Sequence, residues 1–324
     1  MGMSKPTVFL TRLLPAEVMT ELKGKFDLRY NRYDRPLTQA QIMRGVLKAD
    51  GLISMLSDSI DAETISSGHR LKIIANYAVG FNNIDIHAAT KRKIAVTNTP
   101  GVLTETTADL TFALILSAAR RLIEAEPVAR SGKWGGWSPT ECLGTDVYGK
   151  TLGIVGMGRI GQAVARRAAG FSMKVVYYSR NRLPLKDERR LAIDYLPLSN
   201  LLSCSDYVSL HLPLTDVSYH LIDGKALSLM KPTAFLINTS RGPIVDEKAL
   251  IHALSQKRIA GAGLDVFEQE PSVPDRLRKM KTTVLLPHIG SASKETRTRM
   301  GFMVIENLSA VFSERQPPNR VNLM

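Results

Sequence analysis

Three glycines stand at a spacing that suits a phosphate-bearing ligand. Gly156, Gly158 and Gly161 follow the apolar run 152–155 and accompany a helical pattern that opens at Arg159. The first glycine permits a tight turn, the second lets the backbone approach a pyrophosphate, and the third lets the helix pack closely on the strand. The helix N-terminus adds free N–H groups and a favourable dipole. Because strand, glycine turn and amphipathic helix occur in this order, the stretch predicts a dinucleotide site rather than an ordinary turn.

The next expected strand ends in a polar, basic turn. A site specific for NAD carries Asp or Glu about 20 residues after the glycines, where the carboxylate binds the ribose hydroxyls. Here the chain has Ser179, Arg180 and Arg182, and no carboxylate stands within 178–182. A hydroxyl and two guanidiniums suit a 2′-phosphate, so NADP(H) is the preferred cofactor and NAD(H) the second option. The alternative interpretation is a solvated basic turn.

Three further residues could act on a small anionic substrate. Arg241, Glu270 and His288 each follow a separate apolar stretch that predicts a strand. In an open α/β sheet, ligands bind at the carboxyl ends of the strands. Singly these residues could be a surface arginine, a solvated glutamate and a capped histidine. Together they supply an anion clamp, a proton donor and a carboxylate that orients and charges the donor.

The elements that must position these residues alternate between strand and helix, which predicts parallel sheets covered by helices on both faces. A helical run from 103 to about 130 separates two such series, and a loop rich in Gly and Trp follows it over 131–150. In the first series we expect strands at 7–12, 50–56, 71–79 and 94–99 and helices at 15–24, 37–49 and 84–93. In the second we expect strands at 151–157, 174–179, 206–212, 234–239, 260–266 and 282–288, before a helix at 293–312.

The expected fold class is therefore α/β, with two Rossmann-like parallel-sheet domains. The dinucleotide-binding domain, 104–291 with a bridging helix at 104–130, is inserted into a smaller, flavodoxin-like substrate domain made of 1–103 and 292–324. A length of 324 residues fits two domains.

Composition restricts the remaining classes. No apolar run approaches the roughly 20 residues of a membrane span, and the first residues lack a signal-peptide pattern. Cys142 and Cys204 have no metal-ligand spacing and predict reduced thiols in a cytoplasmic protein without a metal site. The net charge of +13 is spread along the chain, and no nucleic-acid-binding signature accompanies it. We interpret the charge as a solubility feature that also steers anionic ligands.

With these motifs in view, the sequence resembles the D-isomer-specific 2-hydroxyacid dehydrogenases over nearly its whole length. Within that family it is most similar to the glyoxylate/hydroxypyruvate reductases, including bacterial enzymes that also reduce 2-ketogluconate. The narrower similarity rests on 102–121 and on KWGGW at 133–137. The stretches that carry the family resemblance are 76–89, 153–165, 211–215, 237–250, 262–271 and 287–293.

The resemblance implies catalytic roles that agree with the residue chemistry. Arg241 would hold the substrate's carboxylate and carbonyl oxygen, and His288 would protonate that oxygen as hydride reaches the carbon. Glu270 would bind the other imidazole nitrogen and favour the charged ring. The implied reactions are the NADPH-dependent reduction of glyoxylate to glycolate and of hydroxypyruvate to D-glycerate. The alternatives are a 2-ketogluconate reductase and, from another class, an NAD(H)-sensing protein like the corepressors that share this fold.

The resemblance also assigns binding residues and an assembly. The glyoxylate/hydroxypyruvate reductases are dimers, and Trp137 matches a tryptophan that reaches the neighbouring subunit's substrate pocket. Trp134 and Trp137 could instead cover the protein's own hinge. Substrate would also be bound by Val79, Gly80 and Ser291. The cofactor-binding residues beyond the glycines and the basic turn would be Thr107, Arg159, Ile160, Leu212, Pro213, Thr239 and Asp265.

Overall fold

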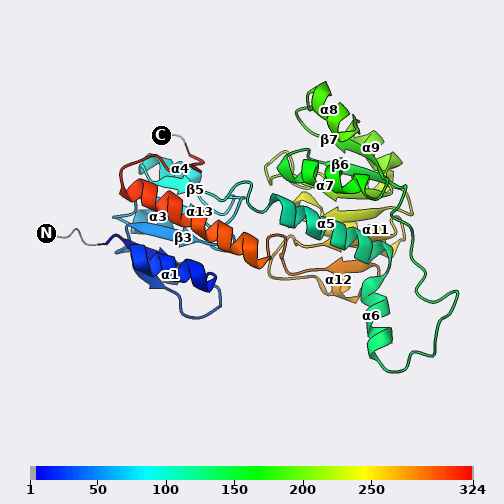
Figure 1. The fold of residues 1–324 in the computed structure, drawn as a ribbon, viewed down its shortest axis with the longest axis horizontal. Coiled ribbons are helices and arrows are strands. Elements are labelled where there is room, and N and C mark those ends of the chain that lie inside the picture. The colour runs from blue at the N-terminus through cyan, green and yellow to red at the C-terminus, as the bar shows by residue number, and fades with distance from the viewer. Residues whose placement is uncertain (1–4, 323–324) are drawn as a thin grey trace. The chain divides into compact units, whose positions relative to one another are not determined.

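The computed structural model describes residues 5–322, and its contacts divide the chain into two units (Figure 1). The first unit is formed by the chain up to Leu103 and from Ser291 onward, and the second unit is Thr104–Gly290. The second unit thus ends at Gly290, one residue before the expected end of the dinucleotide-binding domain at 291. Within 5–322 no helix is both long and apolar enough to cross a membrane.

The first unit contains a five-stranded parallel sheet in the order β2-β1-β3-β4-β5. This is the flavodoxin-like order, in which crossover helices cover both faces. The strands are β1 (Thr7–Leu10), β2 (Asp27–Tyr30), β3 (Gly51–Ser54), β4 (Ile73–Asn76) and β5 (Ala95–Thr97).

Alternation along the strands explains why helices pack on both faces of this sheet. Val8 and Leu10 contribute to one apolar cluster, with α1 and α13, whereas Phe9 contributes to another, with α2, α3 and α4. Successive side chains of a strand point to opposite faces, so a continuous apolar strand needs cover on each side. The helices are α1 (Ala16–Lys25), α2 (Gln39–Val46), α3 (Ala62–Ser67), α4 (Ile86–Lys91) and α13 (Lys294–Phe312).

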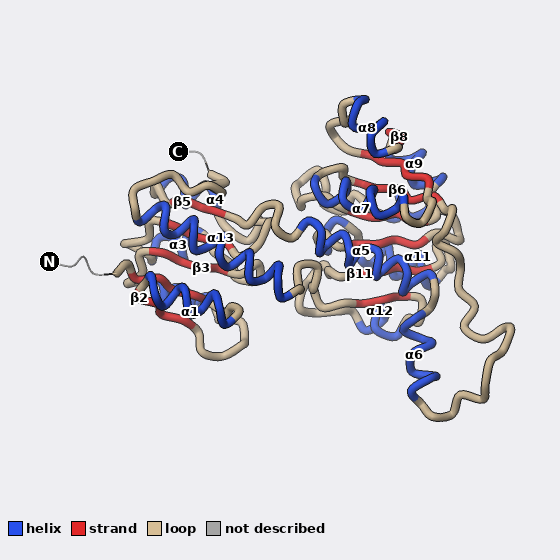
Figure 2. The backbone as a smooth tube through the Cα atoms, viewed as in Figure 1, coloured by secondary structure: helices blue, strands red, loops and turns tan. Residues whose placement is uncertain are grey.

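The second unit contains a seven-stranded parallel sheet in the order β12-β11-β10-β9-β6-β7-β8 (Figure 2). The chain runs outward from β6 through β7 to β8 and then returns to β9, so the order reverses between β6 and β9. The strands are β6 (Thr151–Val155), β7 (Lys174–Tyr178), β8 (Ile193–Tyr195), β9 (Tyr207–Leu210), β10 (Phe235–Asn238), β11 (Gly261–Leu264) and β12 (Thr283–Leu285).

Helices cover both faces of this second sheet as well. The apolar sides of α5 and α7 pack on one face, and those of α9, α10, α11 and α12 pack on the other. The helices are α5 (Thr104–Ala119), α6 (Leu122–Arg130), α7 (Arg159–Ala169), α8 (Leu185–Leu191), α9 (Leu198–Cys204), α10 (Gly224–Leu229), the 3-10 turn η1 (Gly242–Ile244), α11 (Glu247–Ser255) and α12 (Asp275–Lys279).

The predicted fold class, two parallel-sheet α/β domains, is confirmed. The predicted continuous helix over 104–130 is wrong, because the chain breaks between α5 and α6. Arg121 adopts a left-handed conformation there, with φ of 53°, and its guanidinium binds Glu124. After this turn α6 buries none of its residues, whereas α5 lies against the sheet.

Candidate active site

The glycine turn after β6 lies where the strand order reverses, and each glycine has a different environment. Gly156 has φ of 101°, and a Cβ built on it would lie 2.5 Å from the carbonyl oxygen of His211. A Cβ on Gly161 would lie 2.2 Å from the carbonyl oxygen of Gly156, so α7 packs tightly on the turn. A Cβ on Gly158 would meet nothing within 4 Å. The turn therefore needs Gly156 and Gly161 for its own packing. It leaves open space at Gly158, which fits an approaching pyrophosphate.

The N-terminus of α7 completes this phosphate-binding geometry. Gly158 is its N-cap and provides no side-chain cap, and Arg159 and Ile160 form the first helical positions. Uncapped N–H groups at a helix start form an anion site. Leu212 and Pro213 directly follow His211 on the neighbouring strand end. The residues present thus fit a dinucleotide at this turn.

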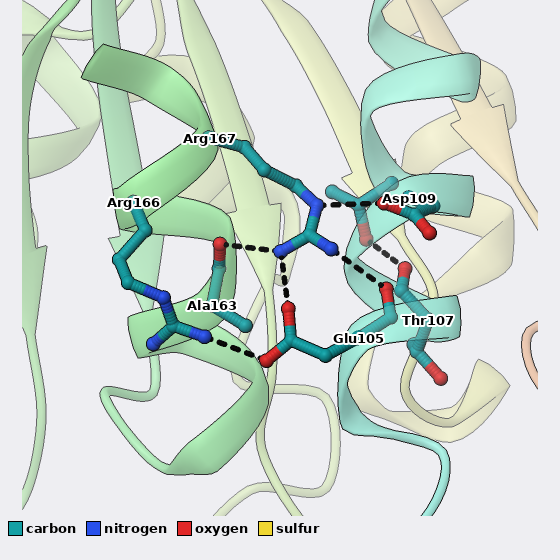
Figure 3. A network of polar contacts seen from close by, with 7 residues as sticks. Glu105, Thr107, Asp109, Ala163, Arg166 and Arg167 are labelled. Carbon is teal, nitrogen blue, oxygen red and sulfur yellow. Dashed lines mark hydrogen bonds and ion pairs between the residues drawn. The ribbon is translucent and has the colours of Figure 1, made fainter. Parts of the chain in front are cut away.

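A charged network fixes α7 against α5 (Figure 3). Arg167 donates to Asp109 at 2.7 Å, to Glu105 at 2.7 Å and to the Ala163 carbonyl at 3.0 Å, while Arg166 donates to Glu105 at 2.6 Å. Both arginines lie in the last turn of α7, where a positive charge also suits the helix dipole. The network holds the helix whose opposite end faces the phosphate position.

Two threonines of α5 contact the segments that follow β12 and β10. The buried side chain of Thr107 donates to the Gly290 carbonyl at 3.0 Å. Thr111 lies 3.1 Å from Thr239, which directly follows β10. The predicted cofactor positions Thr107 and Thr239 are therefore both buried beside the carboxyl ends of the strands.

The arginines of the basic turn after β7 differ in their contacts. Arg182 forms a bidentate pair with Glu188, with both distances 2.8 Å, and its guanidinium lies over the Tyr195 ring. The hydrogen bonds from Arg182, and then from Tyr177, lower the pKa of Glu188 to about 2. Ser179 is half-buried and Arg180 is exposed. Arg182 thus already has a carboxylate partner, which leaves Ser179 and Arg180 as the groups available to a 2′-phosphate.

His288 and Glu270 form a hydrogen-bonded pair at the ends of β12 and β11. Nδ1 of His288 lies 2.8 Å from Oε2 of Glu270, and the side chains are 23% and 30% exposed. Because a carboxylate only accepts, Nδ1 carries the proton. The Phe267 N–H donates to the second oxygen of Glu270 at 3.1 Å. Burial alone would raise the pKa of Glu270, but the hydrogen bond and charge of His288 hold it below its usual value.

Arg241 lies beyond β10, within the electrostatic reach of Glu270. Its guanidinium donates to the Ser240 carbonyl at 2.6 Å, and its own carbonyl accepts from Asn238 at 2.9 Å. Burial lowers the pKa of Arg241, and the charge of Glu270 opposes this effect. An arginine remains charged despite such a shift, so the site contains a half-buried cation that suits a carboxylate.

Gly242 is a site residue that the sequence analysis missed. A Cβ on it would lie 1.9 Å from the backbone carbon and oxygen of Phe267 and 2.5 Å from the Glu268 nitrogen. The turn that presents Arg241 therefore packs directly on the segment that leads to Glu270. The Gly-Pro step immediately after Arg241 was the available signal, since such steps mark turns.

Asp265 is fully buried and organises the His288 segment. Its carboxylate accepts from the Ile289 N–H at 2.7 Å and the Gly290 N–H at 2.8 Å, while its carbonyl accepts from the His288 N–H. These bonds hold His288 at φ of 54°, an uncommon conformation for a non-glycine residue. Burial raises the pKa of Asp265 to about 6, against the opposing effects of these N–H groups and of His288.

The remaining predicted residues belong to other parts of the chain. In the first unit, the carbonyls of Val79 and Gly80 accept from Asn98 and Asn76, at 2.7 and 2.8 Å. The Ser291 carbonyl accepts from the Arg297 side chain at 3.2 Å. In the second unit, Trp137 lies in the loop after α6 and is 83% exposed.

A glycine turn at the point where the strand order reverses, with an imidazole–carboxylate pair and a half-buried guanidinium on neighbouring strand ends, defines a dinucleotide-dependent oxidoreductase that acts on an anionic substrate. The comparisons with known proteins identify the family. Residues 112–290 match the D-isomer specific 2-hydroxyacid dehydrogenase, NAD binding domain. The chain belongs to this family, whose members are NAD(P)-dependent oxidoreductases.

Individual relatives match almost end to end. The glyoxylate reductase of Korarchaeum cryptofilum is 53% identical over 98% of this chain and 96% of its own length. The glyoxylate reductase of Thermococcus litoralis is 50% identical over 98% and 97%. A crystal structure of an NADPH-dependent glyoxylate/hydroxypyruvate reductase from Sinorhizobium meliloti, in complex with NADP and malonate, has a TM-score of 0.88 at 34% identity and covers 98% of this chain and 97% of that one.

These matches confirm the predicted family and enzyme class. The protein is an oxidoreductase that uses a nicotinamide cofactor and reduces 2-oxo acids.

Proposed function

We propose that the protein is an NADPH-dependent reductase of glyoxylate and hydroxypyruvate, which yields glycolate and D-glycerate. The observation that carries this proposal is the 2.8 Å contact between His288 and Glu270 beside the half-buried guanidinium of Arg241. A proton donor is required when a carbonyl oxygen becomes a hydroxyl, and a carboxylate partner favours the charged form of an imidazole donor. A fixed cation suits a substrate that carries a carboxylate next to that carbonyl.

The chain's own residues divide the work of the reaction. Arg241 binds the substrate's carboxylate and orients its carbonyl oxygen. His288 gives a proton from Nε2 to that oxygen, and Glu270, bound at Nδ1, stabilises the imidazolium that must be present beforehand. The nicotinamide cofactor, when bound, supplies the hydride that the carbonyl carbon receives. Hydride and proton together convert the 2-oxo acid into the 2-hydroxy acid.

Several residues would hold the cofactor, and the glycine turn is the core of this set. We assign the pyrophosphate to the glycine turn and the start of α7, and the nicotinamide amide to Asp265. Ser179 and Arg180 would bind the 2′-phosphate that distinguishes NADPH from NADH. Arg182 would keep the turn in shape through Glu188. The full proposed set is Thr107, Gly156, Gly158, Arg159, Ile160, Gly161, Ser179, Arg180, Arg182, Leu212, Pro213, Thr239 and Asp265.

The proposal extends to residues outside the catalytic pair. Val79, Gly80 and Ser291 would contribute to substrate binding, and the N–H groups of Val79 and Gly80 donate no hydrogen bond within residues 5–322. We also propose a homodimer in which Trp137 contributes to the neighbouring subunit's pocket. Its 83% exposure favours a partner over a role as a cover of the chain's own hinge. Since neither Cys142 nor Cys204 forms a disulfide in the structure, we retain the proposed cytoplasmic location.

The deciding experiment is a panel of 2-oxo acids measured with NADPH and with NADH. We expect the highest kcat/KM for glyoxylate or hydroxypyruvate with NADPH. A clear preference for 2-ketogluconate would replace the proposed substrate, and cofactor binding without turnover would indicate a nucleotide sensor.

A histidine variant tests the proposed proton donor in the same assay. His288→Ala should lower kcat by about 100-fold or more while the affinity for NADPH stays near that of the wild type. His252→Ala is the matched control, because His252 is exposed on α11 and lies outside the proposed machinery. Equal activity of the two variants would exclude His288 as the proton donor.

A further inference from the structure

The first unit contains a pocket that the proposed reaction does not use. It has a volume of about 450 Å³ and lies at the amino ends of β4 and β5. The loop with Val79 and Gly80 follows the opposite, carboxyl end of β4. Lys72 precedes β4, Lys93 precedes β5, and the segment after α13 forms the remaining wall. The pocket is therefore separate, within its own unit, from the loop assigned to the substrate.

The lining of this pocket is strongly cationic. Among residues 5–322, its charged lining residues are Lys72, Arg92, Lys93, Arg315, Arg320 and one carboxylate, Glu314. The guanidinium of Arg92 donates to the carbonyls of Ile65 and Gly68 at the end of α3. Among residues 5–322, none of the side chains of Lys72, Lys93 and Arg315 forms an ion pair. Because these five cations outnumber the carboxylate, they repel one another, so their grouping favours an external anion.

Arg320 provides an independent observation. Its Nη2 atom is buried and has no hydrogen-bond partner within the described part of the chain. Buried polar atoms are ordinarily paired, and a buried guanidinium nitrogen without a partner is costly. The side chain is held in place by a long contact of 3.4 Å from Nε to Asn322. No carboxylate within residues 5–322 pairs with this guanidinium, so its charge adds to the positive potential of the pocket lining.

The chain segment that carries Arg320 is firmly anchored to the sheet. Thr97 and Arg320 form an antiparallel bridge, and the Val321 N–H donates to the Val96 carbonyl at 2.9 Å. The buried Asn322 accepts from the Val96 N–H at 2.8 Å and donates to the Ile94 carbonyl at 2.9 Å. The position of Arg320 is thus preformed, which lowers the entropic cost of binding.

We propose that this pocket, the basic pocket, binds a small phosphorylated molecule. Guanidinium and ammonium groups bind phosphate oxygens through short, charge-assisted hydrogen bonds. The volume lies in the range of small-molecule sites. No aromatic residue of the described part of the chain lines the pocket, so these residues offer no stacking platform of the kind that single-stranded nucleic acids use. The basic pocket is a second anion site, distinct from the dinucleotide site of the other unit.

The proposal can be tested with inorganic pyrophosphate as the probe and the full-length protein. Isothermal titration is carried out with the enzyme saturated with NADP⁺, so that the dinucleotide site is already filled. Ionic strength is held constant with chloride, because diffuse electrostatic attraction falls with salt. We expect saturable binding of one pyrophosphate per chain.

Two double variants separate the basic pocket from the general positive charge of the protein. Lys72→Gln with Arg315→Gln removes two exposed lining residues and should weaken pyrophosphate binding about tenfold or more. Lys48→Gln with Arg44→Gln removes the same charge from exposed positions of the same unit and should weaken it less than about twofold. Arg320→Gln should also weaken binding, but the first pair decides because its side chains are exposed and unpaired.

Three outcomes would overturn the proposal. The first is the absence of saturable binding by the NADP⁺-saturated wild type. The second is an equal loss in both double variants, which would indicate diffuse charge only. The third is tighter binding of a short single-stranded oligonucleotide that is lost in Lys72→Gln with Arg315→Gln, which would make this face a nucleic-acid surface.

Discussion

Replacing Glu270 by Gln isolates the charge in the catalytic pair. Glutamine is isosteric and its amide oxygen can still accept from Nδ1 of His288, so the variant removes the negative charge and, with it, the acceptor of the Phe267 N–H. The carboxylate stabilises the imidazolium over the neutral ring, and its own pKa is lowered in return. Without that charge, the protonated donor should persist only to a lower pH. The alkaline limb of the reduction rate should therefore move to lower pH.

The size of this shift follows from the geometry of the pair. At the observed 2.8 Å, two unit charges attract by about 1.5 kcal/mol in water-like surroundings and about 6 kcal/mol at an effective dielectric constant of about 20. Both side chains are roughly a quarter exposed, so solvent screening favours the lower part of this range. Measured hydrogen bonds to charged groups contribute about 1.5–3 kcal/mol. At about 1.4 kcal/mol per pH unit, the limb should move by about 1 to 2 units.

The assay is kcat/KM for glyoxylate reduction as a function of pH, with NADPH saturating. Glu268→Gln is the matched control, since Glu268 lies on the same segment and binds another histidine, His220, at 3.0 Å. The control should leave the alkaline limb in place. If the profile of Glu270→Gln coincides with those of the wild type and the control, Glu270 does not supply the charge that His288 needs.

Three further predictions concern the cofactor, the turn beside the site and the assembly. Ser179→Asp combined with Arg180→Ala should lower the NADPH/NADH ratio of kcat/KM by about tenfold or more, because a charged hydrogen bond is replaced by repulsion; Arg182→Ala should change the ratio less and the melting temperature more. Gly242→Ala should reduce kcat/KM by about 100-fold, since the clash displaces the site by an ångström or more, and an active variant would contradict the tight packing. Trp137→Ala should weaken glyoxylate turnover more than that of bulkier 2-oxo acids, and light scattering should show a dimer for the wild type; a fully active monomer would exclude a shared pocket.

The features that the sequence predicted are those with a local cause. A glycine at φ of 101° and a β-strand–turn–helix pattern are written in adjacent residues, so the turn at Gly156 could be identified without any tertiary information. The strands that were missed are short edge strands. β2 has no buried residue, and β8 spans only Ile193–Tyr195. Their apolar signal is weak because one side of each strand has no neighbour.

Other features depend on contacts between distant residues and could not be predicted. Gly242 touches a backbone segment about 25 residues away in the chain, and only the folded sheet brings the two together. The break at Arg121 involves neither glycine nor proline, so no local signal ended the helical pattern there. The partner of Arg182 is only six residues distant, yet it depends on the helix α8 that begins at Leu185.

The pairing of the basic residues changes how the net charge of +13 should be interpreted. Arg167 and Arg182 contribute to that number, but each is bound to carboxylates of the fold, so neither is available to a ligand without losing a native contact. Arg180 and Lys72 form no ion pair within residues 5–322, and they lie in the basic turn after β7 and in the basic pocket. The net charge counts paired and unpaired basic residues equally. Only an unpaired residue can attract an anion without losing a native contact. The unpaired basic residues are therefore the ones that indicate anionic ligands. They indicate two positions at which to test for phosphate binding, the turn with Arg180 and the basic pocket with Lys72.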